Sequence, residues 1–207
     1  MTNSEVDILI CTTGERDSLD QAILSALSQT YKAAHCVVIS DGPCPAAEKR
    51  VERMRQFGSI DYYETPLKLG SGNCVKDWYI NYGPSRRPWI RTLDDDDWLP
   101  VNAIEDMMLH ALSRSDVSLV TCEALTLYHK ADIQRYRVCP GHMVEDELGF
   151  GGALFSLKHA RGIPIPNEAF GDFQFLRAVA ERGHWIRVPM PLYVYQAYRD
   201  NHDRGYA

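Results

Sequence analysis

Residues 94–100 read Asp-Asp-Asp-Asp-Trp-Leu-Pro, and they follow the apolar run Pro-Trp-Ile-Arg-Thr-Leu at residues 88–93. Four adjacent carboxylates repel one another, so a cation is needed wherever the folded chain holds them together. Mg²⁺ and Mn²⁺ take oxygen ligands, and Mg²⁺ is usually held by one or two carboxylates together with substrate phosphates. The stretch therefore predicts a site for a metal-bridged phosphate donor. The alternative is a solvated loop or helix start, with Asp95 and Asp97 facing water.

The beginning of the sequence predicts a strand, a helix and a second strand. Residues 6–11 form a short apolar run that ends at Thr-Thr-Gly, which is typical of a buried strand. Ser18 is the expected N-cap of a helix over residues 19–28, and residues 36–40 form the next apolar run. This order predicts a βαβ unit, in which the two strands are parallel and the crossover is right-handed.

The same alternation continues along the rest of the sequence. We expect further strands at residues 60–64, 88–93, 117–122, 185–188 and 192–195, and a strand pair or irregular excursion at 125–136. We expect helices at residues 46–57, 102–113, 157–161 and 171–182, and one that begins in the glycine-rich turn at 69–73 and ends near 82. An alternation of this kind predicts an α/β protein with a central sheet.

Polar clusters follow three of the predicted strands. These clusters are Thr12-Thr13-Gly14, Asp41-Gly42 and the run from Asp94 to Asp97. In open α/β sheets, ligands bind outside the carboxyl ends of the strands. We therefore expect the three clusters to share one rim of the sheet and to form one binding site.

Length and composition restrict the class of protein. The chain has 207 residues, of which 45% are hydrophobic and 24% charged, as in an ordinary globular domain with a buried core. The formal net charge of -6 disfavours a sequence-independent grip on nucleic acid, which depends on Lys and Arg. No stretch approaches the roughly 18 apolar residues of a membrane-spanning helix, and we see no secretory leader, so we expect a cytoplasmic protein.

The six cysteines are scattered and contain no Cys-x-x-Cys pair that would indicate zinc or redox chemistry. Cys11, Cys36 and Cys122 lie in or beside apolar runs. A free thiol in such a place behaves as a small buried hydrophobe, so we expect these three side chains in the core.

Four segments together resemble the family 2 glycosyltransferases, which are inverting nucleotide-sugar enzymes of the GT-A fold. They are the strand, loop and helix at residues 8–31 with their Ser-x-x-x-Gln-Thr-Tyr ending, the strand at 37–42 that ends in Asp-Gly, the Leu-Asp-x-Asp-Asp segment with its Leu-Pro at 93–100, and the Gly-Asp-Phe-Gln-Phe-Leu helix at 171–183. The last segment is similar to the Glu-Asp-x-x-Leu helix that carries the catalytic base of the family. The resemblance covers essentially residues 6–196.

This resemblance implies a fold and an activity. The fold would be a single GT-A domain over residues 1–207, with a Rossmann-like, mostly parallel sheet flanked by helices. Its nucleotide-binding half would lie at about 1–100 and its acceptor and catalytic half at about 101–207. The activity would be metal-dependent, inverting and hexosyltransferase-like. It would use Mn²⁺ or Mg²⁺ and would transfer a sugar from a nucleotide-sugar donor, a UDP-sugar, to an acceptor hydroxyl.

The resemblance also implies roles for particular residues. Asp41 would accept from the uracil N3–H of a UDP-sugar, Asp96 would bind the metal and Asp172 would be the general base. The backbone of Thr12, Thr13 and Gly14 would lie along the base and ribose. The implied donor-binding residues are Thr12, Thr13, Gly14, Arg16, Asp41, Lys68, Gly70, Lys76, Arg91, Asp94 and Asp95.

Basic side chains near the rim are candidates to hold the diphosphate, because charged donors form strong hydrogen bonds with phosphate oxygens. These candidates are Lys68, Lys76, Arg91 and Arg199. His202, in the polar tail, is a candidate second metal ligand if a lid closes over the site.

Two positions depart from the family pattern. Gly171 stands where an acidic residue commonly precedes the base, and Ser40 replaces the first Asp of the Asp-Asp-Gly turn. Two alternative functions also stay open, namely a sugar nucleotidyltransferase and a non-catalytic nucleotide- or glycan-binding protein of the same fold. The acceptor, which could be a glycan, a lipid-linked sugar, a protein or a modified base, and the donor sugar are not identified by the sequence.

Overall fold

The computed structural model describes residues 4–130, 133–144 and 148–197. Its first half alternates strands and helices, as the sequence predicted. In chain order these elements are β1 (Val6–Thr12), α1 (Leu19–Leu27), β2 (Ala34–Ser40), α2 (Pro45–Met54), β3 (Ile60–Glu64), α3 (Gly72–Asp77) and β4 (Trp89–Asp94). A 3-10 turn at Arg55–Phe57 extends α2, and a π-helical turn at Trp78–Tyr82 extends α3.

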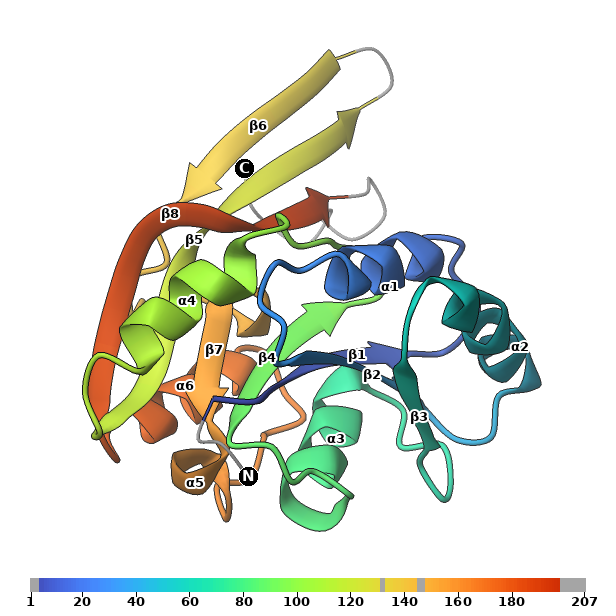
Figure 1. Ribbon diagram of the computed structural model, residues 1–207, viewed down its shortest axis with the longest axis horizontal. Helices are drawn as coiled ribbons and strands as arrows, with labels where there is room; N and C mark the ends of the chain where they lie inside the picture. The colour runs from blue at the N-terminus through green and yellow to red at the C-terminus, as the bar shows by residue number, and fades with distance from the viewer. Residues whose placement is uncertain (1–3, 131–132, 145–147, 198–207) are drawn as a thin grey trace.

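The second half adds longer strands. Its elements are α4 (Ala103–Ala111), β5 (Val117–Lys130), β6 (Ile133–Cys139), β7 (Ala153–Ser156), α5 (Leu157–Ala160), α6 (Gly171–Ala180) and β8 (His184–Ala197). A 3-10 turn at Phe150–Gly152 leads into β7. The expected excursion at 125–136 is the end of β5 and the start of β6, and Figure 1 shows these strands as a ribbon that projects from the body.

All these strands form one eight-stranded sheet in the order β3-β2-β1-β4-β7-β5-β6, with β8 paired to β5. Strands β1, β2, β3 and β4 are mutually parallel, which confirms the predicted βαβ unit. Strand β7 runs antiparallel to both β4 and β5, so it joins the parallel half to the second half. The sheet is therefore mixed, with parallel pairing among β1, β2, β3 and β4 and again between β5 and β8.

Helices cover both faces of the sheet (Figure 1). Helices α1 and α4 pack on one face, where Ile23 and Met107 belong to the same core cluster. Helices α3 and α6 pack on the other face, where Val75 and Leu176 belong to a second cluster. Since both faces are covered, every residue of β1 is buried, which explains why most residues of that strand are apolar.

Two local expectations differ from the structure. Ser18 stands at the N-cap position of α1, as expected, but it lies in helical conformation and its side chain makes no cap hydrogen bond. The two late strands are one strand, β8, whose pairing with β5 shifts register near Glu123. The break that the sequence indicated falls at Pro189–Pro191, and proline lacks the N–H that a regular ladder needs. The expected burial of Cys11, Cys36 and Cys122 is confirmed.

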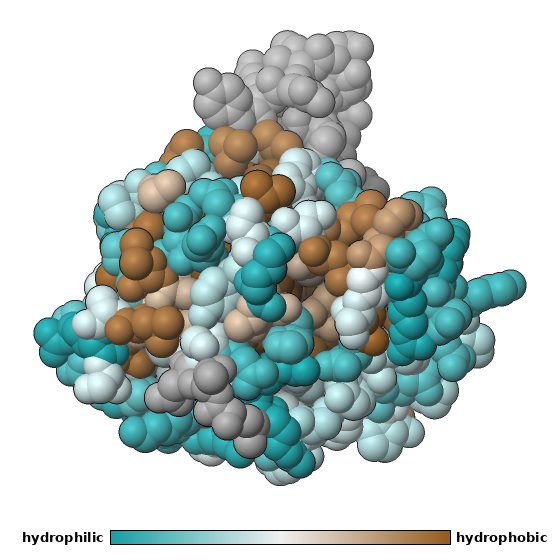
Figure 2. All heavy atoms as spheres, viewed as in Figure 1, coloured by the Kyte–Doolittle hydropathy of each residue, from teal (hydrophilic) through white to brown (hydrophobic). Residues whose placement is uncertain are grey.

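Apolar side chains also reach the surface. Leu109 and Leu112, in or next to α4, are 73% and 50% exposed. On the face seen in Figure 2, apolar areas are separated by hydrophilic ones. Within the part of the chain that the structure describes, none of the helices has the length and apolar character needed to cross a bilayer.

Candidate active site

A cavity of about 470 Å³ lies where β1, β2 and β4 end. Its wall brings together the three polar clusters that the sequence predicted to share a rim. The lining residues are Cys11, Thr12, Thr13, Arg16, Asp41, Lys68, Gly70, Ser71, Gly72, Val75, Asp94, Asp95, Asp96 and Tyr195. Of the expected donor-binding residues, Gly14, Lys76 and Arg91 are not part of this lining.

The turn after β1 is tied to the aspartate run. The Thr12 hydroxyl donates to Asp95 Oδ2 over 2.6 Å and accepts from the Gly14 N–H over 2.9 Å. Gly14 has a φ of +78°, and a Cβ there would lie 2.6 Å from Cys44 Sγ. A residue with a side chain would be strained and crowded, so glycine fixes the path of this turn.

Asp41 holds the glycine-rich loop. Its two carboxylate oxygens accept from the backbone N–H groups of Leu69 and Gly70, over 2.5 and 2.9 Å. Gly70 has a φ of +86°, a conformation that L side chains rarely adopt. A carboxylate oxygen can accept more than one hydrogen bond, so Asp41 retains capacity for a ligand while it shapes the cavity wall.

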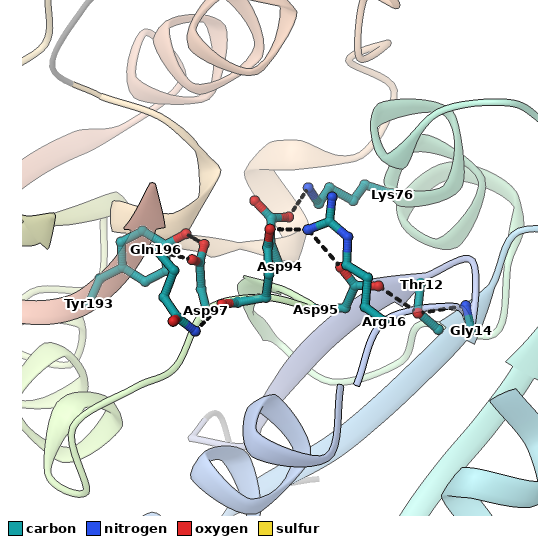
Figure 3. A network of polar contacts seen from close by, with 10 residues as sticks. Thr12, Gly14, Arg16, Lys76, Asp94, Asp95, Asp97, Tyr193 and Gln196 are labelled. Carbon is teal, nitrogen blue, oxygen red and sulfur yellow. Dashed lines mark hydrogen bonds and ion pairs between the residues drawn. The ribbon is translucent and has the colours of Figure 1, made fainter. Parts of the chain in front are cut away.

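The four aspartates lie in a tight turn, closed by a 3.2 Å hydrogen bond from the Asp97 N–H to the Asp94 carbonyl. The side chains of Asp94, Asp95 and Asp97 point in different directions (Figure 3). Asp95 and Asp97 are only 8% and 1% exposed, so the alternative interpretation of a solvated loop is wrong. Asp94 and Asp97 contact different parts of the protein, and Asp95 and Asp96 share one partner.

Asp94 pairs with a buried lysine. Lys76 Nζ lies 2.8 Å from Asp94 Oδ1, and the lysine side chain is 6% exposed whereas that of Asp94 is 44% exposed. The ammonium group also lies 5.0 Å from the centre of the Phe150 ring. Burial alone would lower the pKa of Lys76, but the nearby anions, chiefly Asp94, raise it to about 12. Lys76 in turn holds the pKa of Asp94 below its usual value, so the pair stays charged.

Asp95 and Asp96 share the guanidinium of Arg16. Arg16 Nη1 is hydrogen-bonded to Asp96 Oδ2 and lies 3.6 Å from Asp95 Oδ1. Burial raises the pKa of Asp95, which the Thr12 and Arg16 contacts partly offset. In Figure 3 the Arg16 side chain reaches across from the β1 turn toward the aspartates, on the same side as Lys76.

Asp97 points away from these contacts, toward β8 (Figure 3). It accepts from the Tyr193 hydroxyl and, over 2.7 Å, from the Gln196 N–H. Burial, together with the neighbouring Asp94, raises the pKa of Asp97 to about 7. Asp97 therefore serves to anchor β8 rather than to line the cavity.

The carboxylates suit a divalent cation in part. Asp95 and Asp96 offer hard oxygen ligands, and the Arg16 guanidinium already supplies a positive charge between them. Among the described residues, no group of three or more His, Cys, Asp or Glu side chains is placed to hold a metal ion. A cation here would need further ligands from a bound phosphate or water, as is usual for Mg²⁺. His202 and Arg199 lie outside the described residues.

Asp172 stands in the first turn of α6. Its carboxylate accepts from the N–H groups of Phe150 and Phe173, over 3.3 and 2.9 Å. A Cβ on Gly149 would lie 2.9 Å from Asp172 Oδ2, so the glycine leaves room for this carboxylate. Glycine at position 171 also has a steric explanation, because a Cβ there would lie 2.0 Å from the Pro166 carbonyl oxygen. Asp172 is absent from the cavity lining but interacts electrostatically with Lys76.

Arg91 requires a correction, because it lies inside the protein rather than at the rim. It is fully buried and donates to the carbonyls of Ala153 and Leu192, over 3.0 and 3.4 Å. Its guanidinium also lies 5.5 Å from the centre of the Tyr193 ring. Arg91 therefore links β4 to β7 and β8 and is not placed to bind a phosphate in the cavity.

Sequence reasoning missed Tyr195 and the pairing of Arg16 with the aspartates. Tyr195 reaches the cavity because Trp98 and Val194 form a bridge that brings β8 beside the aspartate turn. No local pattern indicates that pairing. The sequence did contain a signal for the Arg16 pairing. Arg16 is a basic residue that comes four positions after the end of the first strand, and that strand ends at the same rim as the aspartates.

Comparisons with known proteins identify the family and the fold of the chain. The family model of Glycosyl transferase family 2 matches residues 7–181. The fold is similar to S. aureus TarS 1-349 in complex with UDP-GlcNAc, with a TM-score of 0.76, 10% identity, and coverage of 98% of this chain and 62% of that one. It is also similar to the mannosyltransferase PcManGT from Pyrobaculum calidifontis in complex with GDP-Man and Mn²⁺, with a TM-score of 0.63, 16% identity, and coverage of 98% and 58%.

At such low identity these two likenesses establish the fold, and the chain spans about 60% of the length of each structure. No curated protein sequence matches the chain. The family match extends over most of the chain, from β1 to the end of α6. The protein is therefore a member of glycosyl transferase family 2 with a GT-A fold.

Proposed function

We propose that the protein transfers a hexose from a nucleotide-diphosphate donor, a UDP-sugar, to an acceptor hydroxyl, with inversion at the anomeric carbon. The observation that carries this proposal is the cavity in which Asp41, the Asp95–Asp96 pair and the cations Arg16 and Lys68 meet. Such a wall combines acceptors for a base with positive charge for a diphosphate. The proposed single-domain organisation and cytoplasmic location stay predictions.

The donor would lie across the cavity. Asp41, at the end of β2, would accept from the base, and the turn at Thr12–Gly14 would follow the ribose. Arg16 and Lys68 would contact the diphosphate oxygens. A divalent cation on Asp95 and Asp96 would supply Lewis-acid stabilisation of the charge that gathers on the leaving diphosphate.

The reaction breaks the bond between the anomeric carbon and the diphosphate oxygen and forms a bond to the acceptor oxygen. The acceptor hydroxyl must lose its proton as it attacks, and Asp172 is proposed to take it. Two backbone N–H groups fix the Asp172 carboxylate. Attack from the Asp172 side, opposite the leaving group, would invert the anomeric configuration.

The test uses donor hydrolysis, because the acceptor is not identified. UDP- and GDP-sugars are first screened with Mn²⁺ by thermal unfolding, since a ligand that binds the folded state raises the melting temperature. Release of nucleoside diphosphate from the binding donor is then measured. Asp172→Asn is expected to slow this release by about 10²–10⁴-fold, because a general base is lost, and to retain donor binding.

Asp116→Asn is the matched control, because Asp116 is a surface residue paired with Arg114 and is not part of the cavity lining. This control is expected to match the wild type in binding and turnover. Unchanged turnover in Asp172→Asn would remove Asp172 from the mechanism. Binding without turnover in the wild type would favour the non-catalytic alternative, and pyrophosphate release from a nucleoside triphosphate and a sugar phosphate would favour a nucleotidyltransferase.

A further inference from the structure

Two cations contact the aspartate turn, and their side chains differ in exposure. The Lys76 side chain is only 6% exposed and is enclosed beside Asp94 and Phe150. The Arg16 side chain is 45% exposed, lies in the loop between β1 and α1, and lines the cavity. An exposed arginine has several rotatable bonds and can exchange partners, whereas a buried lysine is fixed by its surroundings.

Arg16 occupies the carboxylates that a metal would use. Its guanidinium is bonded to Asp96 and stands 3.6 Å from Asp95. A divalent cation cannot take both carboxylates as ligands until the guanidinium moves, because two positive groups so close together repel each other. The described residues also offer no group of three ligands that would favour the metal by themselves.

We propose that Arg16 makes metal binding depend on the donor. In the free protein Arg16 neutralises Asp95 and Asp96 and keeps the metal out. When a nucleotide diphosphate enters the cavity, its oxygens attract the guanidinium and also supply the missing metal ligands. Arg16 then moves from Asp96 to the diphosphate, and the metal takes the vacated carboxylate. This inference rests on the proposed function, since it assigns Arg16 a role in the same donor site.

The consequence is a measurable coupling between Mn²⁺ and nucleotide. Binding to the protein is followed by the loss of the electron paramagnetic resonance signal of free Mn²⁺, with Mn²⁺ alone and with Mn²⁺ in saturating UDP or GDP, after subtraction of the loss that the same nucleotide causes without protein. We expect the nucleotide to raise the Mn²⁺ affinity of the wild type by about tenfold or more, within the range typical of coupled sites. No turnover is needed for this measurement.

Arg16→Gln is expected to bind Mn²⁺ alone about tenfold more tightly than the wild type, because the competing cation is gone. The nucleotide should then add less to the Mn²⁺ affinity, because the diphosphate has lost a partner. Arg16→Lys keeps a cation and is expected to restore exclusion of Mn²⁺ in the absence of nucleotide. Thermal unfolding checks that each variant is folded.

Arg53→Gln is the matched control, because Arg53 pairs with Asp20 and does not line the cavity. It is expected to equal the wild type in every titration. Equal Mn²⁺ affinity in the wild type and Arg16→Gln, with an intact response to nucleotide, would overturn the role of Arg16 and leave the proposed function standing. Absence of Mn²⁺ binding by the wild type even with UDP or GDP would overturn both the Arg16 role and the metal in the proposed function.

Discussion

Arg91 illustrates how a charged side chain can serve the interior of this protein. Among the residues that the structure describes, no carboxylate is hydrogen-bonded to its buried guanidinium, which instead donates to two carbonyls and lies beside the Tyr193 ring. Burial lowers the pKa of Arg91. The planar fork of arginine can reach carbonyls on two strands at once, which a lysine ammonium cannot do in the same way.

Arg91→Lys is therefore expected to lower the free energy of unfolding by about 1–3 kcal/mol, because at least one buried carbonyl loses its donor. Nucleotide affinity, measured by calorimetry with UDP, should stay within about twofold of the wild type, a change of only a few tenths of a kcal/mol. Lys68→Ala provides the opposite case, because Lys68 lines the cavity. It should weaken nucleotide binding and leave stability nearly unchanged. A selective loss of nucleotide affinity in Arg91→Lys would return Arg91 to the donor site.

The residue scale is also where sequence reasoning failed most often. Arg91 and Lys76 look alike in the sequence as basic residues near the rim, but one supports the sheet and the other pairs with Asp94. Their difference depends on the direction of each side chain relative to layers that are distant in the sequence. Asp41 was predictable as a rim residue because a turn directly after a strand places it there.

At the scale of elements, the aspartate turn and β8 hold each other in place. Trp98 and Val194 exchange backbone hydrogen bonds of 3.2 and 3.0 Å, and Asp97 accepts from Tyr193 and Gln196. Tyr195, which lines the cavity, lies between these contacts in β8. The position of this part of the cavity wall therefore depends on Asp97.

Asp97→Ala is expected to lower the free energy of unfolding by about 2–4 kcal/mol, because a buried hydroxyl and a buried N–H lose their acceptor. Asp97→Asn keeps a carbonyl acceptor and is expected to lose less. Denaturant unfolding measures both changes. Equal stability of Asp97→Ala and the wild type would show that the anchoring contacts contribute nothing to stability.

Elements whose pattern is local were predicted well, and those that depend on tertiary contacts were not. Strand β3 has the expected bounds, because its Ile and Tyr residues favour a strand and turn residues flank it on both sides, so the local sequence identifies it. Strand β8 was divided in two because the sequence shows its prolines but not the long partner strand β5 that holds both parts in one ladder.

At the scale of the whole molecule, His159 links stability to pH. Burial lowers the pKa of His159, with Lys158 and Arg182 adding to the effect. Its Nδ1 atom is buried and has no hydrogen-bond partner among the described residues. The unfolded chain, with a histidine pKa of about 6.5, therefore takes up a proton more readily than the folded one.

His159 is neutral in both states above about pH 6.5, and the free energy of unfolding is then at its full value. As the pH falls from there through the lowered pKa of the folded state, the unfolded chain takes up the proton first and the free energy of unfolding decreases. We expect the wild type to lose more stability between about pH 7.5 and about pH 5 than His159→Gln does, as measured by urea unfolding at each pH. His184→Gln is the control, because His184 is an exposed residue at the start of β8. The same loss of stability in the wild type and His159→Gln would contradict this account.

The overall architecture was the most predictable level. The parallel half follows from alternating strand and helix patterns, and the position of the site follows from the rule that ligands bind at the carboxyl ends of strands. The antiparallel β7 that joins the two halves was not anticipated, because β7 has four residues and its partners β4 and β5 come from distant parts of the sequence.

The turn that contains the four aspartates has a further consequence. These four identical residues have different surroundings: Asp94 pairs with a lysine, Asp95 and Asp96 share an arginine, and Asp97 accepts from a tyrosine. Deleting one of them would leave the composition nearly the same, but it would move the remaining aspartates to their neighbours' positions and so change the contacts that each one makes. The order and number of the four aspartates therefore matter as much as their total negative charge.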